Sequence, residues 1–195
     1  RSSDLMTIEY LKKGKNAADR AVDDAKVTKI VEDTLQAIAE KGDEALREFS
    51  IKFDNYNPTS FKLSSAEIEN LIKQVSKRDM EDIKFAQSQI RKFAQAQRDS
   101  MLDIEIETMP GVILGHKNIP VQSVGCYVPA GKFPMVASAH MSIVTAEVAK
   151  VPRIVAATPP FKGKPNPAVI AAMHLGGAHE IYVMGGIQAV GAMSL

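Results

Sequence analysis

Three short segments carry residue types that could hold a ligand, and each segment follows an apolar stretch. Residues 127–131 join a tyrosine to a Pro-Ala-Gly turn, residues 158–160 place two prolines after a threonine, and residues 185–188 place a glutamine after two glycines. Glycine lets a backbone approach a ligand closely, and a phenol or an amide supplies hydrogen bonds. These segments are therefore candidates for ligand binding through hydrogen bonds.

Each segment also has a purely structural interpretation. Residues 129–131 can simply form a tight turn, since proline and glycine do so in many loops. The pair Gly185-Gly186 could bring the N-terminus of a helix to a phosphate, but it lacks the full dinucleotide-binding fingerprint. Gln188 falls in the first turn of an apolar helix and must find partners if it is buried. A ligand and a helix cap are both open as partners for Gln188.

The histidines do not form a metal-binding or nucleophilic pattern. His174 and His179 are separated by a Gly-Gly turn, so they do not share a helical face, and no cysteine or carboxylate completes a set with them. No nucleophile elbow and no Ser-His-Asp order is present. We predict no catalytic residue and no metal ligand within this chain.

Composition narrows the class of protein. The 195 residues are 45% hydrophobic and 24% charged, which is typical of a globular chain. The net charge of +1 gives no reason to expect a nucleic acid or a charged membrane surface as a partner. The one cysteine, Cys126, cannot form an internal disulfide, which favours a cytoplasmic location. No apolar stretch reaches the roughly 18 residues of a membrane span.

The first hundred residues predict helices, and a hairpin follows them. Apolar residues recur at helical spacing, and Ser64 with Glu67 forms a capping-box pattern. After Ser100 the apolar residues alternate with acids and the chain turns at Pro110-Gly111, which predicts two short antiparallel strands. The helices are expected over residues 23–41, 64–75 and 78–100, and the hairpin over 103–114.

The last seventy residues predict alternating strands and helices. Strands that are apolar on both faces and are joined by helices indicate parallel strands in a doubly wound α/β sheet. Ligands bind such sheets beyond the carboxyl ends of the strands, where the three segments described above fall. The strands are expected over 121–128, 153–158 and 180–185, and the helices over 137–149, 167–176 and from 187 onward.

Several of these motifs, taken together and in order, resemble the sequence pattern of the histidinol dehydrogenase family. The family pattern G-x-Y-[VI]-P-G-G is similar to "GCYVPAG", its Pro-Pro after the next strand matches "VAATPP", and its [GA]-G-x-Q-A-[IV] segment matches "GGIQAV". The upstream stretches "IVEDTLQAIAEKGDEALREFSIKFD" and "PGVILGHKNIPVQSVGCYVP" are similar to the N-terminal region of the same family. The resemblance covers nearly the whole chain, with several motifs in the same order.

The resemblance implies an NAD-dependent, zinc-requiring alcohol dehydrogenase. Residues 1–120 would form a helical N-terminal region with short strands, and residues 121–195 an incomplete Rossmann-like NAD-binding domain. Tyr127 and Gln188 match family residues that contact NAD, and Pro129 with Gly131 would line the same cofactor cleft. The zinc ligands and the proton-transferring residues would come from later segments that this chain lacks.

The expected substrate is a small polar alcohol. The first prediction is oxidation of L-histidinol to L-histidine, and a paralogue acting on another polar alcohol such as sulfopropanediol is the alternative. A catalytically silent nucleotide-binding module is the alternative from a different class. Because residues 187–195 read as an apolar helix without a stop signal, we expect a truncated N-terminal portion that is inactive alone. The resemblance also implies a homodimer for the full protein.

One residue departs from the family pattern. The family has Pro-Gly-Gly where this chain has Pro129-Ala130-Gly131. If the family glycine has a left-handed backbone conformation, alanine at position 130 would cost about 1–2 kcal/mol. Either the position tolerates alanine or the affinity for the cofactor differs in this chain.

Overall fold

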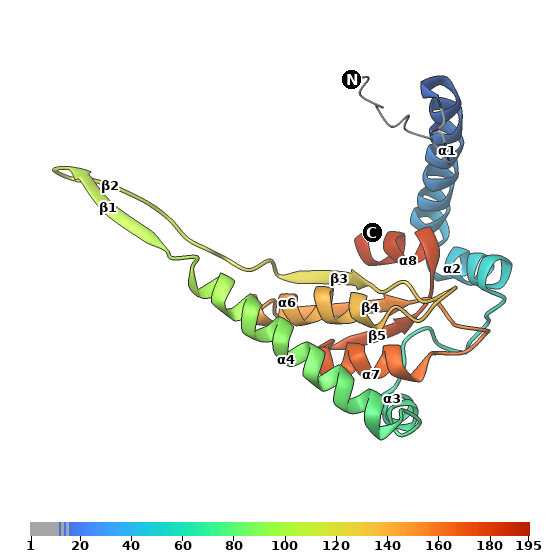
Figure 1. The fold of residues 1–195 in the computed structure, drawn as a ribbon. Helices are drawn as coiled ribbons and strands as arrows, with labels where there is room; N and C mark the ends of the chain where they lie inside the picture. Colours follow the sequence, from blue (N-terminus) through green and yellow to red (C-terminus); the bar gives the residue numbers. More distant parts are fainter. Residues whose placement is uncertain (1–11, 13, 15) are drawn as a thin grey trace, which may run out of the picture.

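The computed structural model describes residues 12, 14 and 16–195 as a layered body from which a helix and a hairpin project (Figure 1). Helices lie on both sides of a small parallel sheet. The helices before the hairpin are α1 (Ala17–Lys41), α2 (Asp43–Phe49), the π-helix η1 (Ser50–Asp54), α3 (Ser65–Ile72) and α4 (Lys77–Asp99). Those that follow it are α5 (Val136–Ala139), the π-helix η2 (His140–Val144), α6 (Thr145–Val148), α7 (Pro167–Gly176) and α8 (Gly186–Ser194).

The sheet confirms the predicted α/β class. Its strands are β3 (Ser123–Tyr127), β4 (Arg153–Thr158) and β5 (Glu180–Val183), in the order β3-β4-β5 and parallel throughout. Strand β4 spans the predicted residues 153–158, whereas β3 and β5 are shorter than predicted but fall in the predicted segments. The contiguous helices α5, η2 and α6 connect β3 to β4, and α7 connects β4 to β5, as expected for parallel neighbours, which need long crossovers.

The two faces of the sheet pack against different helices, which makes the sheet doubly wound. Side chains alternate along a strand, so Cys126, Ile154 and Ile181 point into the core that contains α7 and η2. Tyr127, Ala157 and Tyr182 point to the opposite face, where they pack against residues of α8. Helices α3 and α4 then cover α7, while α1 and α2 contact α8.

Small residues allow the close packing between these layers. A side chain at Gly125 in β3 would lie 3.0 Å from the sulfur of Met193 in α8, and one at Gly176 in α7 would lie 3.2 Å from Ile143 in η2. Both distances are tighter than ordinary van der Waals contact. The glycines therefore set how near the helices approach the sheet and each other.

The predicted helix over 137–149 contains a wider π-helical turn, η2, between two short α-helices. Such a turn leaves carbonyl groups without their usual partners. The hydroxyl of Ser142 donates to the carbonyl of Ser138 at 2.7 Å, and that of Thr145 donates to the carbonyl of Met141 at 2.6 Å. Hydroxyl groups thus satisfy carbonyls around the wider turn, a feature that helical periodicity does not reveal.

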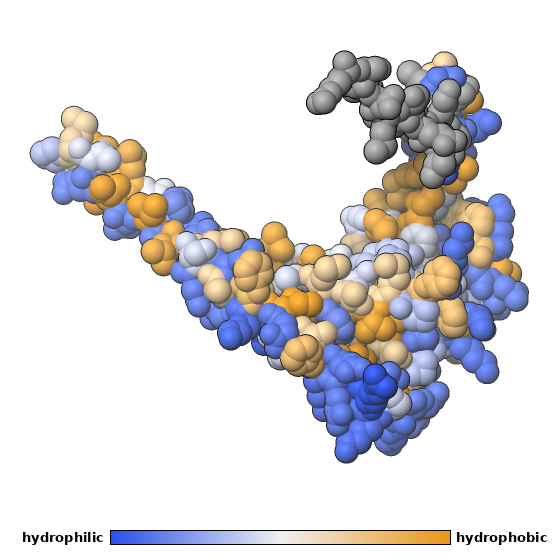
Figure 2. All heavy atoms as spheres, in the orientation of Figure 1, coloured by the Kyte–Doolittle hydropathy of each residue, from blue (hydrophilic) through white to orange (hydrophobic). Residues whose placement is uncertain are grey.

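The hairpin is confirmed and projects away from the body (Figure 1). Strands β1 (Ile104–Met109) and β2 (Val112–His116) pair in antiparallel fashion, with Ile106 opposite Leu114. Gly111 has a φ of +81° in the turn, and its N–H donates to the Glu107 carboxylate at 2.7 Å. Every residue of both strands is exposed, and apolar and polar residues both lie along the arm (Figure 2).

Among the residues described, no helix combines the length and the apolar character that a membrane span requires. Cys126 is buried with a free thiol, and burial raises the pKa of that thiol. It packs in the core of the sheet, as its place in an apolar strand predicted.

Candidate functional site

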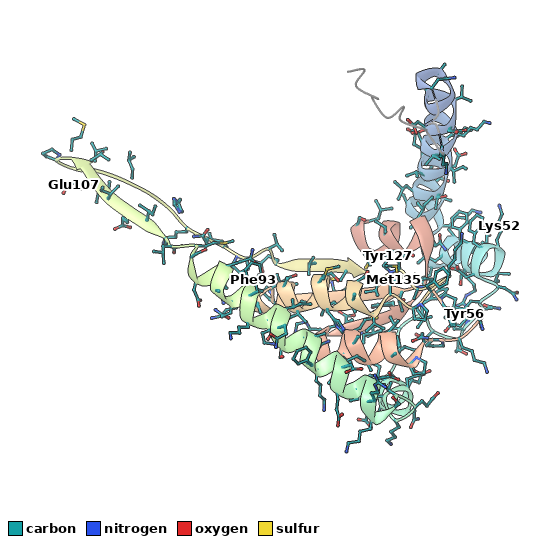
Figure 3. The ribbon with its side chains drawn as sticks, in the orientation of Figure 1. Lys52, Tyr56, Phe93, Glu107, Tyr127 and Met135 are labelled. Atoms are coloured by element: carbon teal, nitrogen blue, oxygen red, sulfur yellow. The ribbon has the colours of Figure 1, made fainter. Side chains whose placement is uncertain are left out.

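The carboxyl ends of the three strands meet at one edge of the sheet. Tyr127 ends β3 opposite Ala157, and Thr158 ends β4 opposite Val183 of β5. The three segments predicted to bind a ligand therefore begin side by side. Figure 3 shows Tyr127 at this end of the sheet.

Tyr127 is hydrogen-bonded to the first residue of α8. The phenol oxygen accepts a hydrogen bond from the backbone N–H of Gly186 at 3.1 Å. Gly186 has a φ of +65°, and a side chain there would lie 2.7 Å from Oε1 of Gln188. Glycine is needed at this position because it avoids both the backbone strain and the collision.

Gln188 lies on the other side of Gly186 and is only 3% exposed. Its Nε2 donates a hydrogen bond to the carboxylate of Asp54 at 3.3 Å. Among the described residues, no donor bonds to its Oε1, which lies over Gly186. Tyr127 and Gln188, the two residues predicted to contact a nucleotide, therefore both lie next to Gly186.

Asp54 is a member of this cluster that the sequence patterns did not single out. It ends η1, 134 residues from Gln188. Burial raises the pKa of Asp54, while the backbone amide of Gly185 and the Gln188 side chain act to lower it. Asn55, the next residue, has a φ of 48° and ends the helical segment.

Pro129 and Gly131 lie in the turn after β3 and are exposed. The Pro129 carbonyl accepts a hydrogen bond from the Met135 N–H at 3.3 Å. A side chain on Gly131 would lie 3.6 Å from Cγ of Pro159, the residue that follows β4. Pro159 would also meet a side chain at Gly185, so the turn borders the same edge as Tyr127 and Gln188.

Ala130 carries none of the strain that a left-handed position would impose. The non-glycine residues with positive φ among those described are Asn55, Lys150 and Lys162. Ala130 is 1% exposed and packs in the main core. The alanine is accommodated at this position, so the possible cost of about 1–2 kcal/mol does not arise.

The N-terminus of α8 is already engaged by protein groups. The Gly186 N–H donates to Tyr127, and the Gly185 amide faces the Asp54 carboxylate. A carboxylate beside these donors opposes the approach of a phosphate. The geometry thus favours a hydrogen-bonding role for the edge over phosphate binding at Gly185-Gly186.

Three of the four histidines face protein groups that give them a structural role. Nδ1 of His140 faces the amide of Gln87 at 3.2 Å in the core, and Nδ1 of His179 accepts from the Ile154 N–H at 2.9 Å. Nε2 of His116 lies 3.1 Å from the Leu102 carbonyl. Among the residues that the structure describes, no group of three or more His, Cys, Asp or Glu could hold a metal ion.

A separate cavity of about 440 Å³ lies against the sheet face that α8 covers. Its lining includes Gly125, Val155 and Met193 together with the cations Lys62 and Arg153, but neither Tyr127 nor Gln188. Both cations bond to Glu180, with Lys62 Nζ at 2.8 Å and Arg153 Nε at 2.7 Å. This cavity is a second place where a ligand could enter.

Replacing Glu180 with glutamine should destabilise the fold more at neutral pH than in acid. Bonds from Arg153, Lys62 and Tyr182 lower the Glu180 pKa from 4.5 to about 2. The stabilisation is therefore full above about pH 4.5 and is lost as the pH falls toward 2. Since both cations are largely exposed, we expect a loss of about 1–2 kcal/mol at neutral pH.

Urea denaturation of Glu180→Gln near pH 7 and near pH 3.5 measures this effect. Glu81→Gln is the matched control, because Glu81 forms an exposed pair with Lys77 at 3.9 Å. An equal difference from the native chain at both pH values would contradict the prediction.

Replacing Thr158 with valine should leave stability unchanged or raise it by about 0.5–1 kcal/mol. Thr158 Oγ1 is a fully buried side-chain oxygen without a hydrogen-bond partner among the described residues. Valine has nearly the same shape and removes this unsatisfied group. A loss of more than about 1 kcal/mol in urea denaturation would show that the hydroxyl has a partner, such as an ordered water.

The sheet, the helices on both faces and the polar cluster at the carboxyl edge define an α/β protein with a Rossmann-like arrangement. A comparison with protein-family models matches residues 17–195 to the model described as histidinol dehydrogenase. The chain belongs to the histidinol dehydrogenase family, which is a family of dehydrogenases.

The chain is similar to several relatives, which carry different names. The chain is 50% identical over 187 residues to a histidinol dehydrogenase homolog of Shouchella clausii, covering 96% of this chain and 44% of that protein. It is 40% identical over 190 residues to the sulfopropanediol 3-dehydrogenase of Ruegeria pomeroyi, covering 97% and 43%. It is 34% identical over 169 residues to the histidinol dehydrogenase of Methanosarcina barkeri, covering 86% and 39%.

The fold agrees with a solved structure. The crystal structure of histidinol dehydrogenase from Elizabethkingia anophelis superposes with a TM-score of 0.79 at 32% identity, covering 94% of this chain and 40% of that one. This chain thus spans less than half the length of these relatives.

Proposed function

We propose that this chain supplies the nucleotide-binding portion of an NAD-dependent alcohol dehydrogenase. The observation that carries the proposal is the convergence of Tyr127 and Gln188 on Gly186, at the carboxyl edge of a parallel sheet, in a chain of this family. Residues 121–195 would form the binding unit. When bound, NAD accepts a hydride from the alcohol carbon.

The residues at the edge fit a nucleotide in specific ways. Gln188 has an amide oxygen that no donor among the described residues uses, and Gly131 carries no side chain where the chain passes Pro159. Gly186 keeps the backbone free of a side chain where the two polar residues meet. Tyr127 and Gln188 would orient the cofactor, and the 129–131 turn would form the adjoining wall.

We also propose, as the family resemblance implies, that the zinc ligands lie outside this chain. Zinc ligands and proton-transferring groups would belong to a longer protein, and this chain alone is expected to be inactive. A cytoplasmic homodimer is likewise the state that we propose for such a protein.

L-Histidinol is the first substrate that we propose for the longer protein. Identity supports a second candidate, because the chain is 40% identical to a sulfopropanediol 3-dehydrogenase and 34% identical to a named histidinol dehydrogenase. Reduction of NAD by each alcohol in turn, followed by absorbance, discriminates between the two substrates.

Calorimetric titration of the 195-residue chain with NAD tests the binding proposal. Tyr127→Phe and Gln188→Ala should each weaken binding at least about tenfold, equivalent to about 1.4 kcal/mol. Tyr182→Phe and Gln89→Ala are matched controls, since the Tyr182 hydroxyl bonds Glu180 at the start of β5 and Gln89 bonds Ser88 on α4. The absence of binding at millimolar NAD, or equal losses in the controls, would contradict the proposal.

A further inference from the structure

Asp54 reaches the candidate site from a distant part of the chain and contacts the residue at its centre. Its carboxylate accepts the Nε2 hydrogen bond of Gln188 at 3.3 Å, and a side chain at Gly185 would lie 3.2 and 3.3 Å from its two oxygens. Lys52 and Tyr56, which flank Asp54 in the chain, lie at the same end of the molecule as Tyr127 (Figure 3). Asp54 is thus part of the edge itself.

The local structure holds Asp54 in place. The hydroxyl of Ser50, which is fully buried, donates to the Tyr56 carbonyl at 2.7 Å, and the Tyr56 N–H donates to the Ser50 carbonyl at 3.2 Å. These two bonds close the π-helix on either side of Asp54, and Asn55 ends it in a left-handed conformation. These bonds therefore fix the backbone from which the Asp54 carboxylate extends.

An ionised carboxylate accepts hydrogen bonds and donates none. The side of the Gln188 amide that faces Asp54 must then be the NH₂ group, and the oxygen must face the other way, over Gly186. Without such a partner, the two orientations of a glutamine amide differ little in energy. The carboxylate decides which atom of Gln188 is available to a ligand.

We propose that Asp54 is a positioning residue that fixes the Gln188 amide so that its oxygen, not its nitrogen, meets a hydrogen-bond donor of the cofactor. This inference rests on the proposed NAD-binding function. The donor would be a ribose hydroxyl or an amide N–H of the nucleotide, since both complement a carbonyl oxygen. Asp54 itself acts through Gln188 and need not touch the cofactor.

Asp54→Asn tests this role with little change in shape. Asparagine can turn its own NH₂ group toward Gln188, and the Gln188 amide then reverses to accept that bond. NAD affinity should fall at least about tenfold in Asp54→Asn but should not fall further when the substitution is added to Gln188→Ala. Asp43→Asn, an exposed aspartate that begins α2, is the control and should bind as the native chain does.

Side-chain amide NMR provides a readout that does not need the cofactor. The NH₂ signals of Gln188, identified by their loss in Gln188→Ala, should shift and exchange faster in Asp54→Asn. Equal losses of affinity in the native and Gln188→Ala backgrounds, or unchanged Gln188 signals in Asp54→Asn, would overturn the inference. Failure of the native chain to bind NAD would overturn the proposed function, and the NMR result would still decide the role of Asp54.

Discussion

Replacing Gly185 with alanine should lower the free energy of unfolding by about 2–3 kcal/mol. The added methyl group would lie 2.6 Å from Cβ of Pro159, a distance that real side chains do not adopt. Pro159 is buried, and its ring cannot rotate away as a flexible side chain could. The methyl group would also crowd the Asp54 carboxylate. The segments that follow β4 and β5 would therefore have to move away from each other and from the end of η1.

Gly131→Ala is the matched control for this prediction, because its methyl group would face the same proline at 3.6 Å, an ordinary contact distance. We expect its stability to lie within about 0.5 kcal/mol of the native value in urea denaturation. Equal stability of the two variants would mean that the strand ends are not packed as tightly as described.

Replacing Gln87 with alanine should cost about 2–3 kcal/mol. Gln87, on α4, is 5% exposed, and its Nε2 donates to the Ala172 carbonyl of α7 at 2.8 Å and meets Nδ1 of His140 at 3.2 Å. Alanine removes the donor that Gln87 supplies to the Ala172 carbonyl and to His140, and it opens a cavity between two helices. Urea denaturation near pH 7 measures the loss.

Gln89→Ala, an exposed glutamine on the same helix, controls for the change in helix composition. It should alter stability by no more than about 0.5 kcal/mol. A similarly small effect of Gln87→Ala would contradict the buried network.

The same network predicts sensitivity to acid. Burial lowers the pKa of His140 below its ordinary value of 6.5, so the unfolded chain binds a proton more readily than the folded one. The stabilisation is complete above pH 6.5 and declines as the pH falls toward the folded-state pKa. A neutral His140 in the fold also keeps Nδ1 available as the acceptor for Gln87.

The sequence predicted the main elements because their periodicity reflects local burial. Stretches that are apolar on both faces identified β4 and β5, and the capping box at Ser64 is present with both of its bonds. Ligands bind parallel sheets beyond the carboxyl ends of the strands, and this rule led to Tyr127 and Gln188 as candidates. In the structure both side chains lie next to Gly186.

Features that depend on contacts between distant segments were not predictable in this way. The bond between Asp54 and Gln188 joins residues 134 apart, and nothing near Asp54 in the sequence marks it. Both π-helices interrupt stretches with ordinary helical spacing. The conformation of Ala130 likewise depends on its packing in the core, which motif comparison alone does not specify.

The most direct test of the cofactor site is to map NAD binding by backbone ¹⁵N chemical shifts. We predict that millimolar NAD perturbs the amides of Tyr127, Gly131, Gly186 and Gln188, at the carboxyl edge. Perturbations confined to Gly125, Val155 and Met193, which line the 440 Å³ cavity, would place the ligand elsewhere and contradict the assignment. Spectra unchanged by NAD would contradict it as well.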